Sequence, residues 1–493
     1  MKIAIIGMGA AGISVLGQWA KYQQLDPSLE LTVYGQKETF GTGLPYQKDT
    51  EEILLNQVAE QMSVDADEPL DFLHWLYEKG IPHPKGSFAS RNLYGVYLKE
   101  RTEEWLEKTG PDILKEEVQS VRKTENNCFE ITSKSGTQVV DVVHLCAGHT
   151  EFSDPYHFEG QERFLSFPFP LEEKIQQLPL HAKVGVLGTG LTSADILRYQ
   201  RKERPDLKLS FYSLDGAFKT IAGPSKKMTY SFFTKENLQN EKDLHNGFVP
   251  LSVYKEWLIK EGECAGVDVR SLWEVPHLGK LDSLEKELDD PETFAVLQSL
   301  IGQMDPFLAD LWLALTEEDK QLFLSTYYDT WEKMRGAFPA STGQQIVTAW
   351  KKKEIEVYDK VQDIQAFSGG FKVFREEDAS PHEIDYLINA TGPKKMFSVD
   401  SVHSPLLHQL LNERLLQPEP FGGVLVTWPD GSAVSQRHGV LENLKVHGSW
   451  ISGIQFGNNA VTLIAEGAQK AVESIVKKET AEQRFTLFSG SGK

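Results

Sequence analysis

The interior segment VGVLGTGLTSADI, residues 184–196, decides the fold. An apolar run of strand length is followed by the turn Gly188-Thr189-Gly190 and then by a helical pattern. This order is typical of a βαβ nucleotide-binding unit, whose helix N-terminus offers backbone N–H groups and a positive dipole to a phosphate. Ser193 stands where the third glycine of the motif would be. A side chain this small still lets the helix pack on the strand.

A second segment of the same kind opens the chain. KIAIIGMGAAGISVL, residues 2–16, places Gly7, Gly9 and Gly12 at the G-x-G-x-x-G spacing after a short apolar run. These glycines permit the tight turn, the approach of a pyrophosphate and the close packing of the helix. A further apolar run at residues 30–34 supplies the strand context that the motif requires. Two complete units predict two bound dinucleotides, a flavin and a nicotinamide that reduces it.

The bulk properties narrow the class of protein. A length of 493 residues predicts two or more domains. The net charge of −20 argues against nucleic-acid and anionic-membrane partners, which require a basic surface. Three scattered cysteines without a C-x-x-C pair fit a reducing cytoplasm, and they give neither a metal site nor the dithiol of a disulfide reductase. We therefore expect a cytoplasmic protein without a metal, and the sequence leaves its oligomeric state open.

Two small-residue turns flank the second cradle. Cys146-Ala147-Gly148 precedes it and Ala390-Thr391-Gly392 follows it, each after an apolar run. This spacing predicts a nicotinamide domain inserted into a flavin domain. We expect an α/β protein with two Rossmann-like, three-layer domains. The flavin domain would comprise residues 1–175 and 345–493, and the NAD(P) domain residues 176–344 with a helical insertion at about 240–339.

Further motifs carry a resemblance to a known family. They are, in chain order, FGTGLPY (40–46), LLNQVAEQMSVD (54–65), FASRNLYGVYL (88–98), the second cradle, W-x-x-x-R at Trp331 and Arg335, and DYLINATGP (385–393). Together they resemble bacterial FAD/NAD(P)-binding proteins related to the flavin-dependent N-hydroxylating monooxygenases, over nearly the whole chain. The resemblance implies that NAD(P)H reduces FAD. It also implies that molecular oxygen is used to oxygenate a nucleophilic nitrogen or sulfur of a small, amino-acid-like substrate.

The candidate site residues are mostly turns and short polar side chains. For FAD they are Gly7, Gly9, Ala10, Ala11, Gly12, Gln36, Gly41, Gly43, Tyr46, Asn56, Ser63, Arg91, Gly148, Gly392, Gly453 and Asn459. For NAD(P) they are Gly188, Thr189, Gly190, Thr192 and Ser193. Arg335 and Lys219 are candidates for a substrate carboxylate, and Arg91 is a third if it does not hold the flavin phosphates. No catalytic side chain is expected, because a flavin carries its own reactive centre.

Several features depart from the expected motifs. The acidic ribose ligand expected after Tyr34 is missing, and Gln36 is the candidate in its place. After the second cradle, Asp215 favours an unphosphorylated ribose, whereas Lys219, Lys226 and Lys227 could serve a phosphate, so NADH versus NADPH stays open. Gly453 is expected to end a strand, and Asn458 or Asn459 to cap the last helix.

Two other functions stay open at this point. One is a plain NAD(P)H:acceptor flavin oxidoreductase that inserts no oxygen. The other is a non-enzymatic, flavin-binding redox sensor. Coupled consumption of NAD(P)H and oxygen with a substrate distinguishes the monooxygenase from the plain oxidoreductase, and absence of turnover with any acceptor indicates the sensor.

Overall fold

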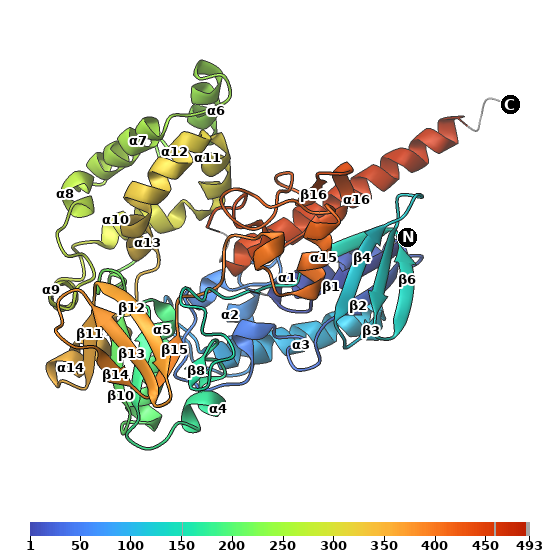
Figure 1. Cartoon of the computed structure of the whole chain (residues 1–493). Coiled ribbons are helices and arrows are strands. Elements are labelled where there is room, and N and C mark those ends of the chain that lie inside the picture. The colour runs from blue at the N-terminus through green and yellow to red at the C-terminus, as the bar shows by residue number, and fades with distance from the viewer. Residues whose placement is uncertain (150, 458–459, 490–493) are drawn as a thin grey trace. The chain divides into compact units, whose positions relative to one another are not determined.

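The computed structural model describes residues 1–149, 151–457 and 460–489, with side chains described up to residue 479 (Figure 1). The chain forms two compact units. The first contains Met1–Lys48, Gln57–Glu151 and Pro393–Lys493, and the second contains Asp49–Asn56 and Phe152–Gly392. The borders expected near residues 175 and 345 therefore lie at about 152 and 392. The border expected at residue 345 is too early, because the later strands β11 (Ile355–Tyr358) and β15 (Tyr386–Asn389) pair with β10 (Lys208–Tyr212) and β9 (Lys183–Leu187) of the second sheet.

The first unit contains a six-stranded sheet in the order β16-β17-β7-β1-β2-β3. The strands are β1 Lys2–Ile6, β2 Glu30–Tyr34, β3 Asp112–Leu114, β7 Val142–Leu145, β16 Ser432–Ser435 and β17 Gly439–Val446, of which only β16 pairs antiparallel. Ile3, Ala4 and Ile5 of β1 are completely buried, as expected for a strand that is covered on both faces. Helix α1, Ala10–Gln23, packs against α3, Arg91–Thr109, and against α16, Val461–Ser489.

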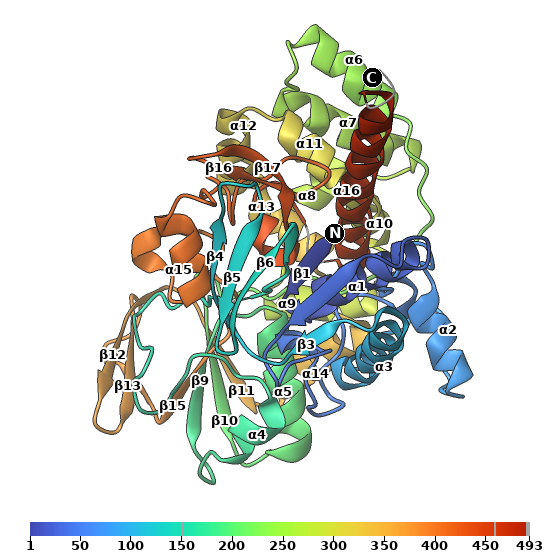
Figure 2. The ribbon, with the colours of Figure 1, turned by 90° about the vertical axis from the view of Figure 1, so that its right-hand side faces the viewer.

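Smaller elements complete the first unit. A separate antiparallel sheet consists of β4 Val118–Lys123, β5 Phe129–Ser133 and β6 Gly136–Val140 (Figure 2). The remaining helical elements are η1 Leu44–Tyr46, η2 Ala59–Gln61, α2 Asp71–Glu78, η5 Val399–Ser401, α15 Pro405–Asn412 and η6 Gly448–Ile451.

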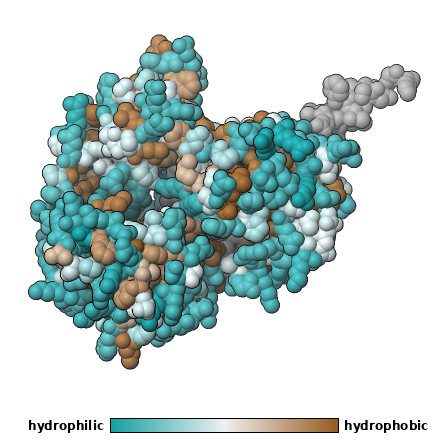
Figure 3. Space-filling view, in the orientation of Figure 1, coloured by the Kyte–Doolittle hydropathy of each residue, from teal (hydrophilic) through white to brown (hydrophobic). Residues whose placement is uncertain are grey.

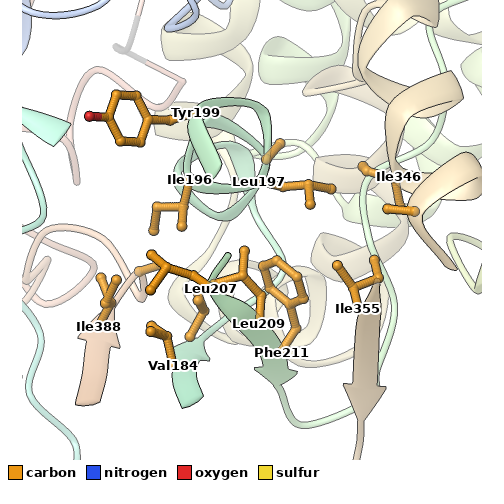
Figure 4. Packing of buried hydrophobic residues seen from close by; sticks show 14 of the residues in the cluster. Val184, Ile196, Leu197, Tyr199, Leu207, Leu209, Phe211, Ile346, Ile355 and Ile388 are labelled. Carbon is orange, nitrogen blue, oxygen red and sulfur yellow. The ribbon is translucent and has the colours of Figure 1, made fainter. Parts of the chain in front are cut away.

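The second unit contains a five-stranded, all-parallel sheet in the order β11-β10-β9-β15-β8. Its strands are β8 Phe164–Leu165, β9 Lys183–Leu187, β10 Lys208–Tyr212, β11 Ile355–Tyr358 and β15 Tyr386–Asn389. Strand residues such as Val184 and Leu209 pack against Ile196 of α5, Leu191–Glu203, in a shared core (Figure 4). Helices α4, Leu171–Gln176, and α14, Ala340–Lys351, belong to the same unit, as does the antiparallel sheet of β12 Val361–Phe367, β13 Gly370–Arg375 and β14 His382–Ile384.

A helical insertion separates β10 from α14, as the sequence predicts. It comprises α6 Lys235–Leu244, α7 Leu251–Cys264, α8 Val269–Trp273, α9 Leu281–Asp289, α10 Ala295–Gln303, η3 Asp305–Phe307, α11 Leu308–Ala314, α12 Glu317–Leu322, the π-helical turn η4 Phe323–Tyr327 and α13 Tyr328–Arg335. The Thr316 side chain caps α12 by accepting a hydrogen bond from the Asp319 backbone N–H at 3.1 Å. That segment has the sequence pattern of a helix start.

The second unit repeats the strand order of the first. In the first unit, β1, α1 and β2 are followed by β3, the three-stranded sheet β4–β6 and then β7. In the second unit, β9, α5 and β10 are followed by β11, the three-stranded sheet β12–β14 and then β15. The sequence reveals only the two cradles, because the inserted helices differ in number and length between the two halves.

A short N-terminal segment, Asp49–Asn56, belongs to the second unit. The Asp49 carboxylate accepts hydrogen bonds from the backbone N–H groups of Leu171 and Glu172, at 2.7 and 3.0 Å, at the start of α4. Ile53 is buried in the second core. Asn56, predicted as an FAD ligand, is the last residue of this segment and is exposed, so the structure places it in the unit of the second cradle.

Glu287 of α9 connects the helical insertion by a hydrogen bond to the segment that follows β10. Its carboxylate accepts hydrogen bonds from the Ile221 backbone N–H at 2.7 Å and from the Ser283 hydroxyl at 3.1 Å. The side chain is 5% exposed. Burial raises the pKa of this carboxyl from 4.5 to about 7. The folded chain therefore holds the proton more tightly than the unfolded chain does.

This raised pKa predicts a pH dependence of stability. The contribution of Glu287 is fully present below pH 4.5 and is lost as the pH rises through about 7. The loss amounts to roughly 3 kcal/mol, at about 1.4 kcal/mol per pKa unit. Thermal melting of Glu287→Gln should therefore show an increasing advantage over the parent between pH 4.5 and 7.5. Asp289→Asn, at an exposed position on the same helix, is the control, and parallel curves for parent and Glu287→Gln would contradict the assignment.

Candidate functional site

The first cradle is a turn that excludes side chains. Gly7 follows β1 with φ +102°, and its N–H donates to the Tyr34 carbonyl at 2.8 Å. A Cβ at Gly7 would lie 2.2 Å from the Cys146 carbonyl oxygen, and a Cβ at Gly12 would lie 1.9 Å from that of Gly7. Only glycine fits at both positions. The turn can therefore bring the end of β7 and the start of α1 into backbone contact.

The glycine-rich loop at residues 40–46 lies against this turn. The Gly41 N–H donates to the Met8 carbonyl at 2.8 Å. A Cβ at Gly9 would lie 3.1 Å from the Cα of Gly43. Two glycines thus face each other beside the N-terminus of α1, where Ala10 and Ala11 follow Gly9. No side chain of the described residues caps this helix, and its first turn carries no acidic residue. The cradle therefore fits a diphosphate, which needs backbone N–H groups and space.

Tyr46 and Arg91 lie near each other in the first unit. Ser90 caps α3 by accepting a hydrogen bond from the Leu93 N–H at 3.1 Å, so Arg91 is the first helical residue. Burial raises the pKa of Tyr46, and the charge of Arg91 opposes this rise. The Tyr46 ring packs edge-on against Tyr94, with 4.7 Å between the ring centroids. Both residues remain candidates for the flavin site.

The end of β17 contributes Gly448 rather than Gly453. The strand stops at Val446, and the His447 N–H donates to the Leu145 carbonyl at 2.9 Å. Gly448 follows with φ +70°, and a Cβ there would lie 3.7 Å from the Cβ of Ala11. Gly453 lies beyond η6 and its N–H donates to the Gly422 carbonyl at 2.8 Å. The expectation that Gly453 ends a strand is wrong, because the glycine directly after the apolar run, Gly448, has that place.

Two other predicted FAD residues, Ser63 and Gly148, lie in loops of the first unit. Ser63 is buried, and its hydroxyl donates to the carbonyls of Asp65 and Glu68, at 3.0 and 2.7 Å, so it shapes its own loop. Gly148 follows β7 with φ +70°, and the Ser449 hydroxyl donates to its carbonyl at 2.7 Å. Asn458 and Asn459 lie outside the described residues.

A buried chain of three side chains supports the first cradle, and no sequence motif indicates it. The Trp19 indole of α1 donates to Nε2 of His144 at 3.1 Å, and Nδ1 of His144 lies 3.0 Å from Nε2 of His447. Since Nε2 of His144 accepts, its Nδ1 carries the proton and donates to His447. Burial lowers the pKa of both histidines, that of His447 to about 3. Two neutral imidazoles therefore connect the cradle helix to β7 and β17.

The second cradle repeats this design in the second unit. Gly188 has φ +103°, and its N–H donates to the Tyr212 carbonyl at 2.7 Å, as Gly7 does with Tyr34. A Cβ at Gly188 would lie 2.9 Å from the carbonyl of Ala390, at the end of β15. Gly392 closes that turn with φ +85° and is the last residue of the second unit. Gly392 thus follows a strand of the second sheet, because β15 pairs with β9, and its assignment to the FAD site stays a prediction.

The polar residues of the second turn mostly hold the turn itself. The Thr189 hydroxyl donates to the Ala217 carbonyl at 2.5 Å. The completely buried Ser193 donates to the Gly188 carbonyl at 2.7 Å, so it replaces the third glycine with a hydrogen bond. Gly190 caps α5, and a Cβ there would meet nothing within 4 Å. Thr192 is half-buried in the first turn of α5. Open space in front of a helix N-terminus fits a second diphosphate.

In the predicted ribose-binding region after β10, Asp215 accepts hydrogen bonds from two lysines. The Asp215 carboxylate accepts from the Lys333 ammonium at 2.6 Å and from the Ala217 N–H at 3.0 Å. Burial raises the pKa of Asp215, but the hydrogen bonds from Lys333 and Ala217 outweigh burial and hold this pKa below its ordinary value. Lys280 donates to the Asp215 carbonyl, while Lys226 pairs with Glu292 at 2.8 Å. This edge carries both an acid, Asp215, which favours a free ribose, and a cation, Lys333, which favours a ribose phosphate. The choice between NADH and NADPH therefore stays open.

The two residues predicted to bind a substrate carboxylate are each paired with an acidic residue of the helical insertion. Arg335 donates through Nε and Nη2 to both oxygens of Asp305, at 2.9 and 3.0 Å, and both side chains are largely buried. Lys219 forms an ion pair with Glu332. A bidentate, buried pair leaves the guanidinium fork occupied. Sequence cannot reveal that Asp305 faces Arg335, and the role of Arg335 as a substrate ligand stays a prediction.

We accordingly expect Arg335→Lys to act on stability. Lysine cannot reproduce the bidentate fork, so the melting temperature should fall by a few degrees, for a loss of about 1–2 kcal/mol. The KM of an identified substrate should change by less than about twofold. Arg270→Lys, an exposed position in the same unit, is the control. An unchanged melting temperature together with a raised KM would restore Arg335 as a ligand.

No metal site or membrane span is found in the described part of the chain. No group of three or more His, Cys, Asp and Glu side chains is placed to hold a metal ion. None of the helices described is both long and apolar enough to cross a membrane. The face in Figure 3 is mostly hydrophilic, with scattered hydrophobic residues.

Comparisons with known proteins agree with the two cradles. Residues 4–150 match the model of a family described as FAD-NAD(P)-binding. No curated protein matches the chain. Among the solved structures that share the fold over nearly the whole chain are three amine hydroxylases. They are ornithine hydroxylase from Pseudomonas aeruginosa (11% identity, TM-score 0.61, 97% of this chain and 98% of that one), ornithine N-hydroxylase from Kutzneria sp. 744 (13%, 0.57, 97% and 99%) and the cadaverine monooxygenase of Erwinia amylovora (14%, 0.58, 96% and 94%).

Residues 4–150, most of which lie in the first unit, are therefore similar to an FAD-NAD(P)-binding domain. The chain as a whole has the fold of these amine hydroxylases, with two parallel-sheet dinucleotide-binding units. The predicted fold class and the predicted FAD/NAD(P) binding are confirmed. The individual ligands stay predictions, apart from the corrections given above.

Proposed function

We propose that this protein is an FAD-dependent, NAD(P)H-using monooxygenase that oxygenates a nitrogen of a small, amino-acid-like substrate. The observation that carries the proposal is the pair of cradles, each with a glycine turn, an adjoining strand end and a helix N-terminus without a side-chain cap. One cradle would hold FAD and the other a nicotinamide dinucleotide. When bound, FAD would accept a hydride from the nicotinamide and, once reduced, react with oxygen.

The residues of this chain would bind and orient the two cofactors. In the first unit, Gly9 and Gly43 leave space for the FAD diphosphate, and the dipole of α1 stabilises its charge. In the second unit, Gly190 leaves the corresponding space for the nicotinamide diphosphate. The amine substrate class is supported by the shared fold, since similar structures are named for acting on ornithine and cadaverine.

A plain NAD(P)H:acceptor oxidoreductase is the second candidate. The engagement of Arg335 with Asp305 and of Lys219 with Glu332 favours it, because both proposed anion clamps are occupied by the protein's own carboxylates. Arg91 would then be the remaining candidate for a substrate carboxylate.

One series of measurements tests the proposal. The absorbance spectrum of the purified protein should show bound flavin, and anaerobic addition of NADH and then NADPH should bleach it. A screen of amino acids and diamines should next find a substrate that stimulates NAD(P)H oxidation and yields a hydroxylamine. If every amine fails while quinones or dyes are reduced quickly, the plain oxidoreductase takes the place of the monooxygenase. If flavin is absent and cannot be bound, both candidates fall.

A further inference from the structure

The first sheet ends in a polar edge beside its cradle. Strands β2 and β3 are parallel neighbours with Tyr34 opposite Leu114, so the residues that follow them lie at the same edge. The Gly35 N–H donates to the Leu114 carbonyl at 3.2 Å and continues this pairing. Just beyond it, the Gln36 side-chain amide donates a hydrogen bond to Oε1 of Glu117. An acidic residue distant in sequence is thus brought to the carboxyl end of β2.

This edge adjoins the glycine turn. A Cβ on Gly35 would lie 3.3 Å from the Cβ of Met8 and 3.0 Å from the ring of Phe40. Met8 is the second residue of the turn, and its carbonyl accepts from Gly41. In a dinucleotide-binding βαβ unit, the adenosine ribose lies at this end of the second strand, where an acidic residue accepts from its hydroxyls.

Glu117 is available for such contacts. It is exposed, and among the described residues its carboxylate has Gln36 as its only hydrogen-bond partner. The preceding acid, Glu116, is engaged instead, because it accepts from the hydroxyls of Ser133 and Ser135 at 2.6 and 2.9 Å. A carboxylate has about four acceptor sites, so Glu117 can accept from ribose hydroxyls while it keeps Gln36.

The matching edge of the second unit is built differently. There the Ser213 N–H donates to the Tyr358 carbonyl at 3.0 Å, in the same register as Gly35 with Leu114. The acid that follows β11 is Asp359, and it lies 3.0 Å from the Lys280 ammonium and 3.3 Å from the Arg375 guanidinium. Because the Asp359 carboxylate already pairs with two cations, we do not expect it to bind a ribose. The uncommitted acid at the first edge is therefore a property of that unit and not of the repeated fold.

We propose that Glu117, oriented by Gln36, is the ligand of the adenosine ribose of FAD. This proposal rests on the proposed function, in which the first cradle holds FAD. Glu117 would then serve as the acid that the sequence lacks after Tyr34. Gln36, which the sequence suggests as the ribose ligand itself, has a different role. The amide of Gln36 acts as a positioning group for the carboxylate, and Glu117 makes the contact with the hydroxyls.

Binding to the full-length chain stripped of flavin tests this. FAD affinity is measured by flavin fluorescence, and ADP and 2′-deoxy-ADP are compared as competitors of FAD. The parent should prefer ADP by about tenfold or more, because a charged acceptor is left without its donor by the deoxy analogue. Glu117→Ala should lower FAD affinity by about tenfold and abolish this preference, since a hydrogen bond to a charged group is lost.

Two further variants complete the test. Glu117→Gln keeps an acceptor without the charge and should retain part of the preference. Glu30→Gln is the matched control, because Glu30 is an exposed acid at the opposite end of β2, paired only loosely with Lys2 at 3.7 Å. Both properties should stay at parent values in that control. Full preference for ADP in Glu117→Ala, with an unchanged melting temperature, would overturn the inference alone. Failure of the parent to bind FAD at all would overturn the proposed function with it.

Discussion

Gly9→Val should remove FAD from the protein. A Cβ at position 9 already lies 3.1 Å from the Cα of Gly43, and the valine methyl groups would extend into the space before the first N–H groups of α1. The variant would lose the helix-terminus interaction with the diphosphate and would push the 40–46 loop away. These two effects together amount to roughly 3 kcal/mol or more, so FAD affinity should fall at least about 100-fold.

The measurement is the flavin content of the purified variant, followed by titration with FAD. Gly467→Val is the matched control, because Gly467 lies in α16 of the same unit and a Cβ there meets nothing within 4 Å. Circular dichroism should show that both variants are folded. Full flavin content in Gly9→Val would show that the first cradle does not hold FAD.

The second large effect is expected for Gly190→Val, which should leave FAD bound and block reduction by the nicotinamide. Around position 190 nothing lies within 4 Å of a Cβ, so the protein itself tolerates the side chain. The valine would instead occupy the space before the N-terminus of α5, where the second diphosphate is proposed to bind. Because the second cradle belongs to its own unit, the damage should not reach the first cradle.

Anaerobic stopped-flow reduction checks this result. At low NADH or NADPH, the rate of flavin reduction should fall at least about 100-fold, since the lost diphosphate contacts and the steric conflict are of the same order as for Gly9→Val. Flavin content should match that of the parent. Gly302→Val, in α10 of the same unit and also in open space, is the control. Parent-like reduction in Gly190→Val would place the reductant elsewhere.

The local parts of the fold could be predicted from sequence because short-range sterics determine them. The spacing of Gly7, Gly9 and Gly12 after an apolar run specifies a turn that only glycine can form at the first and third positions. The same reasoning locates the second cradle, and it accepts Ser193, whose side chain proves to hold the turn by a hydrogen bond. The helical insertion and the cap at Thr316 follow from periodicity and from capping chemistry.

The domain borders could not be placed in this way. Whether an apolar strand such as residues 386–389 joins one sheet or the other depends on its partner, and β15 pairs with β9. Both sheets contain short, largely apolar strands, such as KIAII in the first and KVGVL in the second, so nothing local distinguishes them. The end of β17 has a different cause, since two glycines, Gly448 and Gly453, follow the apolar run and only the structure shows that the strand stops at Val446.

The two glycine cradles, the α/β class and the helical insertion could be predicted from the sequence, since each depends on residues close together in the chain. Which charged groups are already paired becomes visible only in the folded chain. Arg335 meets Asp305 thirty residues away, and Gln36 meets Glu117 eighty-one residues away. The first contact engages a predicted substrate ligand, and the second brings to the first cradle the acid that we propose as the ribose ligand. Both outcomes depend on long-range packing, because a charge is free for a ligand only if the fold has not already given it a partner.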